Sequence, residues 1–367
     1  MNEQPSPQAP RKRWRWILWV PAIVVFSAAP AAFAVLSSID FNRLKPILTQ
    51  VVKEETGRDL EVRGAIDLKL GFRPSLVMDD ISFHNPRWAS RTEMVKINRL
   101  EAEIMVMPLL RGEVHVARLV LFEPDLLLET DRSGKCNFEF EKRGASPQNV
   151  VAPRSFSLPR VAFRLVEVEK GKVSYRDGAT RRVHSLAIDR FTAHSEGIES
   201  PVVLALNGSY KGEPLELRGT VGSLLLLKEQ GGGYPVDLVL KTLGTRLRVE
   251  GRVSDMLNLK GLALMVRADV QSTTRMAAFF GETLTTEFGP LQTRVAISDA
   301  GDKTYKLSDL RISSRVGDAR GSVMVSLGGR RPKLSGTLSS QRFNLDPFFK
   351  EEKTREAQGG KKAHMSH

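Results

Sequence analysis

The sequence predicts a mainly β protein in which an N-terminal transmembrane helix and an amphipathic helix precede a long, curved antiparallel β-sheet that forms a groove. Three observations lead to this prediction. An uncharged stretch follows a basic cluster, one helical pattern of apolar residues follows that stretch, and apolar residues then alternate with polar ones along most of the remaining chain. A closed β-sandwich produces the same alternation, so it stays open as the alternative fold.

The transmembrane helix is predicted over residues 16–39, which carry no charge. An uncharged stretch of about 22 residues is long enough to cross the roughly 30 Å hydrocarbon layer of a membrane. The basic cluster at residues 11–15 is of the kind that stays in the cytoplasm. We therefore expect residues 1–15 to be cytoplasmic and the chain after Asp40 to be exported. A cleavable signal peptide is the alternative, because residues 32–34 read Ala-Phe-Ala.

An amphipathic helix is predicted directly after the membrane segment, with Asp40 as its cap and Gly57 as its stop. It could lie on the membrane surface, or it could plug one end of a β structure. Its apolar side carries Phe41, Leu44, Leu48, Val51 and Val52.

From Leu60 onward the apolar period changes from helical to two, which is typical of strands with one apolar face. Hairpin signals such as Tyr210-Lys211-Gly212 separate the strands, and roughly 15 to 20 short strands are expected. One short helix interrupts them over 274–280, with Thr273 as its cap and Gly281 as its stop. The strand pattern that begins at Leu60 recurs over 100–106, 114–122, 126–128, 173–175, 186–188, 215–221, 236–240, 247–253, 262–268, 291–297, 307–312, 323–327 and 334–338.

Proline-rich and apolar-poor segments divide the exported part of the chain. Residues 146–159 contain three prolines and are predicted to be a linker or a crossing. They separate an N-terminal β region, 40–145, from a C-terminal β region, 160–350. Residues 351–367 lack apolar periodicity and are predicted to be disordered.

The composition argues against nucleic-acid binding, although the formal net charge is +13. Nucleic-acid binders cluster cations near aromatic residues on one face. In this chain the cations stand singly between apolar residues, as solvent-facing strand positions do, and we expect no nucleic-acid partner. Cations of this kind are Arg63, Lys69, Arg164, Lys211, Arg218, Arg248 and Arg252.

The sequence carries no recognisable catalytic, cofactor-binding or metal-binding motif, and the protein is predicted not to be an enzyme. Cys136 is the only cysteine, which excludes an internal disulfide. Asp79 and Asp80 are adjacent acids, which fit a turn or a solvated strand edge better than acid–base catalysis. The histidines at 84, 115, 184 and 194 lack metal-ligand spacing.

Several ordered motifs resemble those of the AsmA family of Gram-negative envelope proteins. They are Thr56 to Gly64, Asn85-Pro86-Arg87-Trp88, Met107 to Val114 and Gly134 to Phe138, and the resemblance extends from Arg11 to Phe349. It implies a bacterial inner-membrane protein with a single span, a cytoplasmic N-terminus and a periplasmic β body that takes part in outer-membrane biogenesis. Its implied partners are the inner membrane, phospholipid or another acyl lipid, and envelope proteins.

The resemblance implies that an apolar groove shields acyl chains, and the alternation predicts which residues line it. The alternative function is a non-enzymatic envelope scaffold, or a regulator of outer-membrane protein assembly. The candidate groove-lining residues are Val62, Ile66, Leu68, Ile104, Val106, Leu217, Val249 and Val253.

Overall fold

The computed structural model describes residues 40–69, 73–105, 116–140, 164–226, 233–256, 260–301, 303–328 and 331–344. The predicted cytoplasmic segment 1–15, transmembrane helix 16–39, linker 146–159 and tail 351–367 lie outside these residues. Within the described ranges, no helix is both long enough and apolar enough to cross a membrane.

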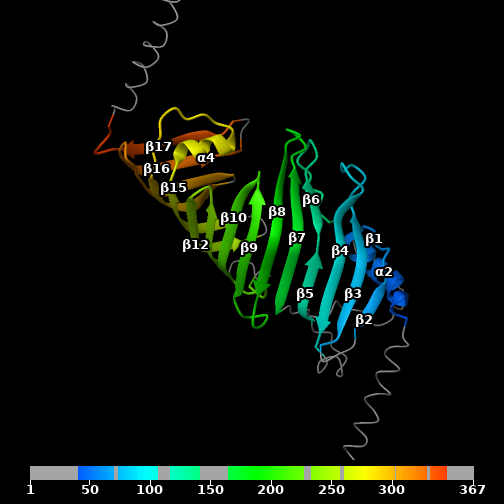
Figure 1. The fold of residues 1–367 in the computed structure, drawn as a ribbon. Helices are drawn as coiled ribbons and strands as arrows, with labels where there is room; N and C mark the ends of the chain where they lie inside the picture. The colour runs from blue at the N-terminus through cyan, green and yellow to red at the C-terminus, as the bar shows by residue number, and fades with distance from the viewer. Residues whose placement is uncertain are drawn as a thin grey trace, which may run out of the picture.

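In the described residues, seventeen strands form one hydrogen-bonded sheet, which twists and curls along its length (Figure 1). The predictions of a mainly β protein and of 15 to 20 strands are therefore confirmed. The strands are β1 (Leu60–Val62), β2 (Ile66–Lys69), β3 (Ser75–His84), β4 (Glu93–Ile104), β5 (Val116–Phe122), β6 (Asp125–Glu129), β7 (Leu165–Arg176), β8 (Val183–His194), β9 (Val202–Tyr210), β10 (Glu213–Val221), β11 (Tyr234–Thr242), β12 (Thr245–Asp255), β13 (Lys260–Val270), β14 (Leu291–Gly301), β15 (Thr304–Ser313), β16 (Asp318–Ser326) and β17 (Lys333–Ser339).

Two strands, β3 and β9, were not among those predicted. In β3 the adjacent Asp79 and Asp80 interrupt the alternation, and Asp80 has a φ of 47°, so the strand contains a local irregularity. In β9 the pair Asn207-Gly208 has the composition of a hairpin turn but lies inside the strand, where it pairs with β8 and β10. Cross-strand pairing therefore overrides the local turn signal at both places.

The sheet is mixed, which corrects the prediction that it is antiparallel throughout. β7 runs parallel to both β5 and β6, and every other described pair is antiparallel. Parallel neighbours need a long connection, and the connection between β6 and β7 includes the predicted crossing 146–159. The strands of both predicted β regions thus belong to the same sheet.

The sheet is narrower than its strand count suggests. β1 and β2 both pair with β3, while β5 and β6 both lie between β4 and β7, so each of these pairs occupies a single position. The seventeen strands therefore fill fifteen positions, which at about 4.8 Å per strand gives a sheet roughly 70 Å wide along its curve. The described strands contact their hydrogen-bonded neighbours rather than a second sheet, unlike the strands of the alternative sandwich.

The predicted amphipathic helix is present and covers the N-terminal end of the sheet. It consists of a 3₁₀ turn, η1 (Phe41–Leu44), followed by α2 (Lys45–Thr56). The Asp40 side chain accepts a hydrogen bond from Asn42 N, and Gly57 ends the helix with a φ of 70°. Phe41 and Leu48 pack against a buried cluster formed by Val62, Ile66 and Ile81. Of the two predicted positions, the helix therefore takes the one against the sheet.

The second predicted helix is α4 (Thr273–Phe280), and its cap is Ser272 rather than Thr273. The Glu287 carboxylate accepts hydrogen bonds from the Ser272, Thr273 and Thr274 hydroxyls. Burial opposes ionisation of Glu287, but these hydrogen bonds outweigh it and hold the pKa of the carboxyl well below its usual value. α4 also reaches the β9–β10 hairpin, where Lys211 Nζ donates to Phe279 O at 3.0 Å. The predicted stop, Gly281, is confirmed by its φ of 84°.

Gly251 inside β12 occupies a position that only glycine can fill. Gly251 in β12 has a φ of 146°, and a Cβ at this position would collide with the backbone oxygen of Ala263 on the neighbouring strand. Only glycine, which has no Cβ, allows the two strands to approach each other so closely at this position.

Candidate functional site

The strand register divides the sheet into one apolar face and one charged face, because directly paired residues project from the same side. One ladder of paired residues runs from Ile66 on β2 to Ala319 on β16 and includes Leu217. Only Thr293 in this ladder is polar. Its members in order are Ile66, Met78, Leu100, Leu121, Val168, Phe191, Leu206, Leu217, Leu240, Leu247, Ala268, Thr293, Ile312 and Ala319.

A second ladder lies beside the first and joins two other candidate residues, Leu68 and Val249. All of its members are apolar or glycine. They are Leu68, Leu76, Ala102, Leu119, Val166, Ala193, Leu204, Gly219, Leu238, Val249, Val266 and Val295. We call the side of the sheet that carries these two ladders the apolar face.

Irregular positions keep the apolar face continuous where simple alternation would break it. Met78 and Ile81 are three residues apart, yet both pack into the same cluster, with the positive-φ residue Asp80 between them. Val168 and Val173 on β7 likewise lie on the same face, with Lys170 at a φ of 53° between them. Bulges of this kind re-aim the following side chains, so the sequence keeps its apolar residues on one side.

The opposite, charged face carries cross-strand ion pairs. Arg118 on β5 donates from Nε to Glu167 on β7 at 2.8 Å, and Arg190 on β8 lies 3.0 Å from Glu169. These pairs stabilise a side of the sheet that faces water. Further ion pairs on this face are Asp79–Arg99, Glu216–Arg218, Glu216–Lys241, Asp237–Arg248, Glu250–Arg248 and Glu250–Arg267.

The structure places the eight candidate groove residues in different environments. Leu68, Leu217 and Val249 are half-buried on the apolar face. Val62 and Ile66 are buried with Phe41 and Leu48 of η1 and α2 packed against them, and Val253 is buried in a second cluster with Tyr234 and Val236. Ile104 belongs to β4, although its side chain is not described, and Val106 lies outside the described residues. The apolar face is therefore covered at these two clusters and only half-buried at Leu68, Leu217 and Val249.

The C-terminal end of the apolar face is open to solvent in the described residues. Leu334 and Leu338 on β17 are 68% and 56% exposed, and their partners on β16 are Val325 and Gly321. Large exposed apolar surfaces are unfavourable in water, and in soluble domains they usually mark a binding surface.

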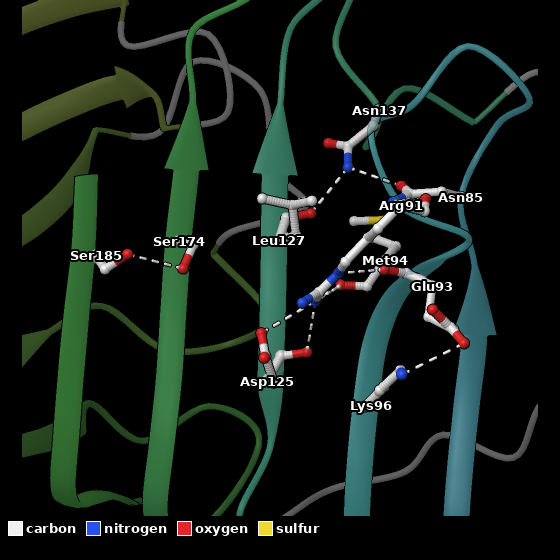
Figure 2. Close-up of polar contacts among 10 residues, drawn as sticks. All are labelled: Asn85, Arg91, Glu93, Met94, Lys96, Asp125, Leu127, Asn137, Ser174 and Ser185. Atoms are coloured by element: carbon white, nitrogen blue, oxygen red, sulfur yellow. Dashed lines mark hydrogen bonds and ion pairs between the residues drawn. The ribbon is translucent and has the colours of Figure 1, made fainter. Parts of the chain in front are cut away.

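A network of hydrogen bonds joins the β3–β4 loop to β6 and the loop after it, and Asn137 is at its centre (Figure 2). The Asn137 side chain is fully buried and donates from Nδ2 to Asn85 Oδ1 at 2.9 Å and to Leu127 O at 2.8 Å. Its Oδ1 accepts from Glu129 N at 2.9 Å. These bonds tie the loop after β6 to the β3–β4 loop.

Arg91 fixes the base of the β3–β4 loop. Its guanidinium donates to Glu93 O at 2.6 Å, to Met94 O at 3.2 Å and to the Asp125 carboxylate at 3.0 Å (Figure 2). The Glu129 carboxylate accepts from Ser90 N at 2.9 Å. The β3–β4 loop is therefore held from both sides before any ligand binds.

These loops surround a cavity of about 780 Å³, which we call the rim cavity. It brings together residues of three motifs that are separate in the sequence: Thr56 to Asp59, His84 to Thr92, and Lys135 to Glu139. None of its residues was among the candidate site residues, because the prediction considered only apolar alternation. The repeated use of asparagine and arginine in these motifs was the signal that could have identified it.

The histidines do not form a common site in the described residues. His84 Nε2 lies 3.6 Å from Glu61, and His184 Nδ1 lies 2.6 Å from the Tyr210 hydroxyl. His194 is exposed at the end of β8, and His115 lies outside the described residues. Of the two adjacent acids, Asp79 accepts a hydrogen bond from Arg99 on the neighbouring strand, so this carboxylate has a structural partner.

Comparisons with known proteins relate the chain to one family. A model of the AsmA family matches residues 11–196, about half of the chain. The chain is also similar to the AsmA family protein YhjG of Escherichia coli (strain K12), with 24% identity over 348 residues that cover 86% of this chain and 50% of YhjG. The chain thus spans about half the length of this curated relative. The range matched by the family model includes the rim cavity and the N-terminal part of the apolar face.

Proposed function

Because the chain belongs to the AsmA family, we propose that it is a protein of cell-envelope biogenesis, anchored in the inner membrane, whose periplasmic sheet handles or transfers phospholipid. The observation that supports this proposal best is the pair of apolar ladders that cross the sheet on one face, opposite a face of ion pairs. Binding would require no chemical step, so the protein acts without being an enzyme. The inner membrane and an acyl lipid are its partners, and envelope proteins could receive the lipid.

The physical basis is the transfer of acyl chains from water to the apolar face. Burying apolar surface contributes roughly 25 cal/mol per Å², so a chain lying along several rungs of a ladder gains several kcal/mol. The side chains of the two ladders are mostly aliphatic and similar to one another, so they do not fix the position of a bound acyl chain along the ladder. Contacts of this kind favour binding without trapping the lipid at one position, as transfer requires.

The proposal is tested by placing a photo-crosslinking amino acid at Leu240, on the apolar face, or at its sequence neighbour Lys241, on the charged face. We expect lipid to be captured from position 240 in cells and not from position 241, because the two side chains point to opposite sides of β11. The measurement is mass spectrometry of the crosslinked product. Capture of proteins instead of lipid at position 240 would contradict the proposal and favour the scaffold or regulator of outer-membrane protein assembly.

The membrane anchor is a separate prediction that rests on the uncharged residues 16–39. The full-length protein should stay with the inner membrane through an alkaline carbonate wash, and its β body should be digested when protease enters the periplasm. A soluble form that begins at Val35 would instead show cleavage after residues 32–34, and the anchor would then be wrong while export would stand.

A further inference from the structure

We propose that the rim cavity binds the phosphate-bearing headgroup of an anionic lipid whose acyl chains lie on the apolar face. This inference rests on the proposed function and names the class of lipid. More cations than carboxylates line the cavity. The cations are Arg58, Arg87, Arg91 and Lys135, and the carboxylates are those of Asp59 and Glu139.

The two carboxylates reduce this positive charge only in part. Asp59 is engaged by Lys53, whose Nζ lies 2.8 Å from its carboxylate, and Arg91 is held by Asp125. Arg87 is exposed on the β3–β4 loop. Guanidinium groups match phosphate oxygens in geometry as well as in charge, so a lining of this kind favours a phosphate group over a neutral or cationic one.

The cavity lies at the strand ends where a further apolar ladder begins. Its lining residues Asp59 and His84 are sequence neighbours of Leu60 and Phe83, which pair with each other on the apolar face. From Phe83 this ladder continues through Val95, Leu126, Val173 and Leu186. Adjacent side chains on a strand point to opposite faces, so a ligand in the cavity reaches this ladder around the ends of the strands, by way of Phe140, which packs on Phe83.

Aromatic residues join the charged cavity to the apolar ladder. The Arg58 guanidinium lies 4.9 Å from the centre of the Phe140 ring, and Phe140 packs edge to face on Phe83 with their ring centres 6.0 Å apart. Trp88, which lines the cavity, is 37% exposed, and Phe138, next in sequence to the lining residue Glu139, is 44% exposed. The protein thus presents a cation, then aromatic rings, then aliphatic side chains. A phospholipid presents its phosphate, glycerol and acyl chains in the matching order.

Size and rigidity also suit a headgroup. A volume of about 780 Å³ lies within the usual range of small-molecule sites, about 300 to 1,000 Å³. The Asn137, Asn85 and Arg91 hydrogen bonds hold the loops in place before binding, so little ordering of the protein is needed when a ligand enters.

The test uses the full-length protein in detergent micelles and two probes with the same photoreactive acyl chains, phosphatidylglycerol and diacylglycerol. The variant Arg87→Gln/Lys135→Gln removes two cations from the cavity. Its matched control, Arg252→Gln/Lys306→Gln, removes the same two residue types from exposed strand positions far from it. Arg87→Gln alone is the second variant, in case the double change disturbs the turn at Lys135, and thermal melts verify that each variant is folded.

We expect the wild type to bind phosphatidylglycerol more tightly than diacylglycerol. The cavity variant should bind phosphatidylglycerol at least tenfold more weakly, because two cations that donate charge-assisted hydrogen bonds to the phosphate are lost, and its diacylglycerol binding should not change. Arg87→Gln alone should weaken phosphatidylglycerol binding in the same direction, by a smaller factor. The control variant should match the wild type with both probes.

Four results would overturn the inference. Equal capture of the two probes by the wild type would show that the headgroup is not recognised, while lipid handling on the apolar face would stand. Equal weakening of both probes in a folded cavity variant would have the same meaning. Binding of soluble glycerol phosphate as tight as that of phosphatidylglycerol would identify a site for free phosphate. Capture of neither lipid would overturn the proposed function itself, and the headgroup inference with it.

Discussion

Replacing Val249 with glutamate is expected to reduce lipid crosslinking from the apolar face at least tenfold while the melting temperature stays near that of the wild type. Val249 is half-buried on β12 and pairs with Leu238 and Val266, both of which are apolar. A carboxylate at this position keeps its water in the unoccupied protein, so the folded state loses only about 1 kcal/mol. An acyl chain that covers it removes that water, and leaving the charge unpaired opposes binding by several kcal/mol.

The matched control is Val239→Glu, the same change on the adjacent strand. Val239 is also half-buried, but it lies on the charged face and pairs with Arg218 and Arg248. Its carboxylate would lie between two cations, and we expect wild-type crosslinking. If Val249→Glu instead abolished cooperative unfolding, the position would be part of a closed core, because a buried unpaired charge can remove much of a stability of about 5 to 15 kcal/mol. Unchanged crosslinking in a folded Val249→Glu protein would also contradict the lipid path.

The second large effect is expected for Asn137→Ala, which should destabilise the rim by about 3 kcal/mol. The Asn137 side chain has no exposed surface, and its removal leaves Glu129 N, Leu127 O and Asn85 Oδ1 without the partners that they have now. Each buried polar group left unsatisfied costs about 1 to 3 kcal/mol, and water entering the space recovers part of that loss. Hydrogen exchange at the amides of Glu129 and Ser90 is the most direct measurement, since both amides bond within this network.

Asn98→Ala provides the comparison for Asn137→Ala. The Asn98 side chain is exposed and donates one hydrogen bond, to Glu123 at 2.9 Å, so its loss should change stability by less than about 0.5 kcal/mol. If Asn137→Ala exchanged no faster at Glu129 and Ser90 than Asn98→Ala, the buried network would not be what holds the loops around the rim cavity.

Both variants depend on features that the sequence reveals to different degrees. The side of the sheet on which Val249 lies followed from period-two alternation, because neighbouring side chains on a strand point to opposite faces. Asn137 belonged to a motif that resembled a family, but the sequence carried no sign that it is buried or that Asn85 and Leu127 are its partners. Those partners are 52 and 10 residues away and meet only through the pairing of β3, β4 and β6.

The sequence by itself determined the β class, the approximate strand number, the helix between Asp40 and Gly57, and the separation of apolar from charged side chains, because all of these follow from local periodicity and capping. Only the tertiary structure decided that β7 runs parallel to β5 and β6, and that β3 and β9 are strands despite their irregular composition. It also decided that Ile66 is buried beneath the first helix while Leu68, two residues later, is half-buried. Alternation specifies the face on which a side chain lies, but what covers that face depends on contacts between segments far apart in the chain.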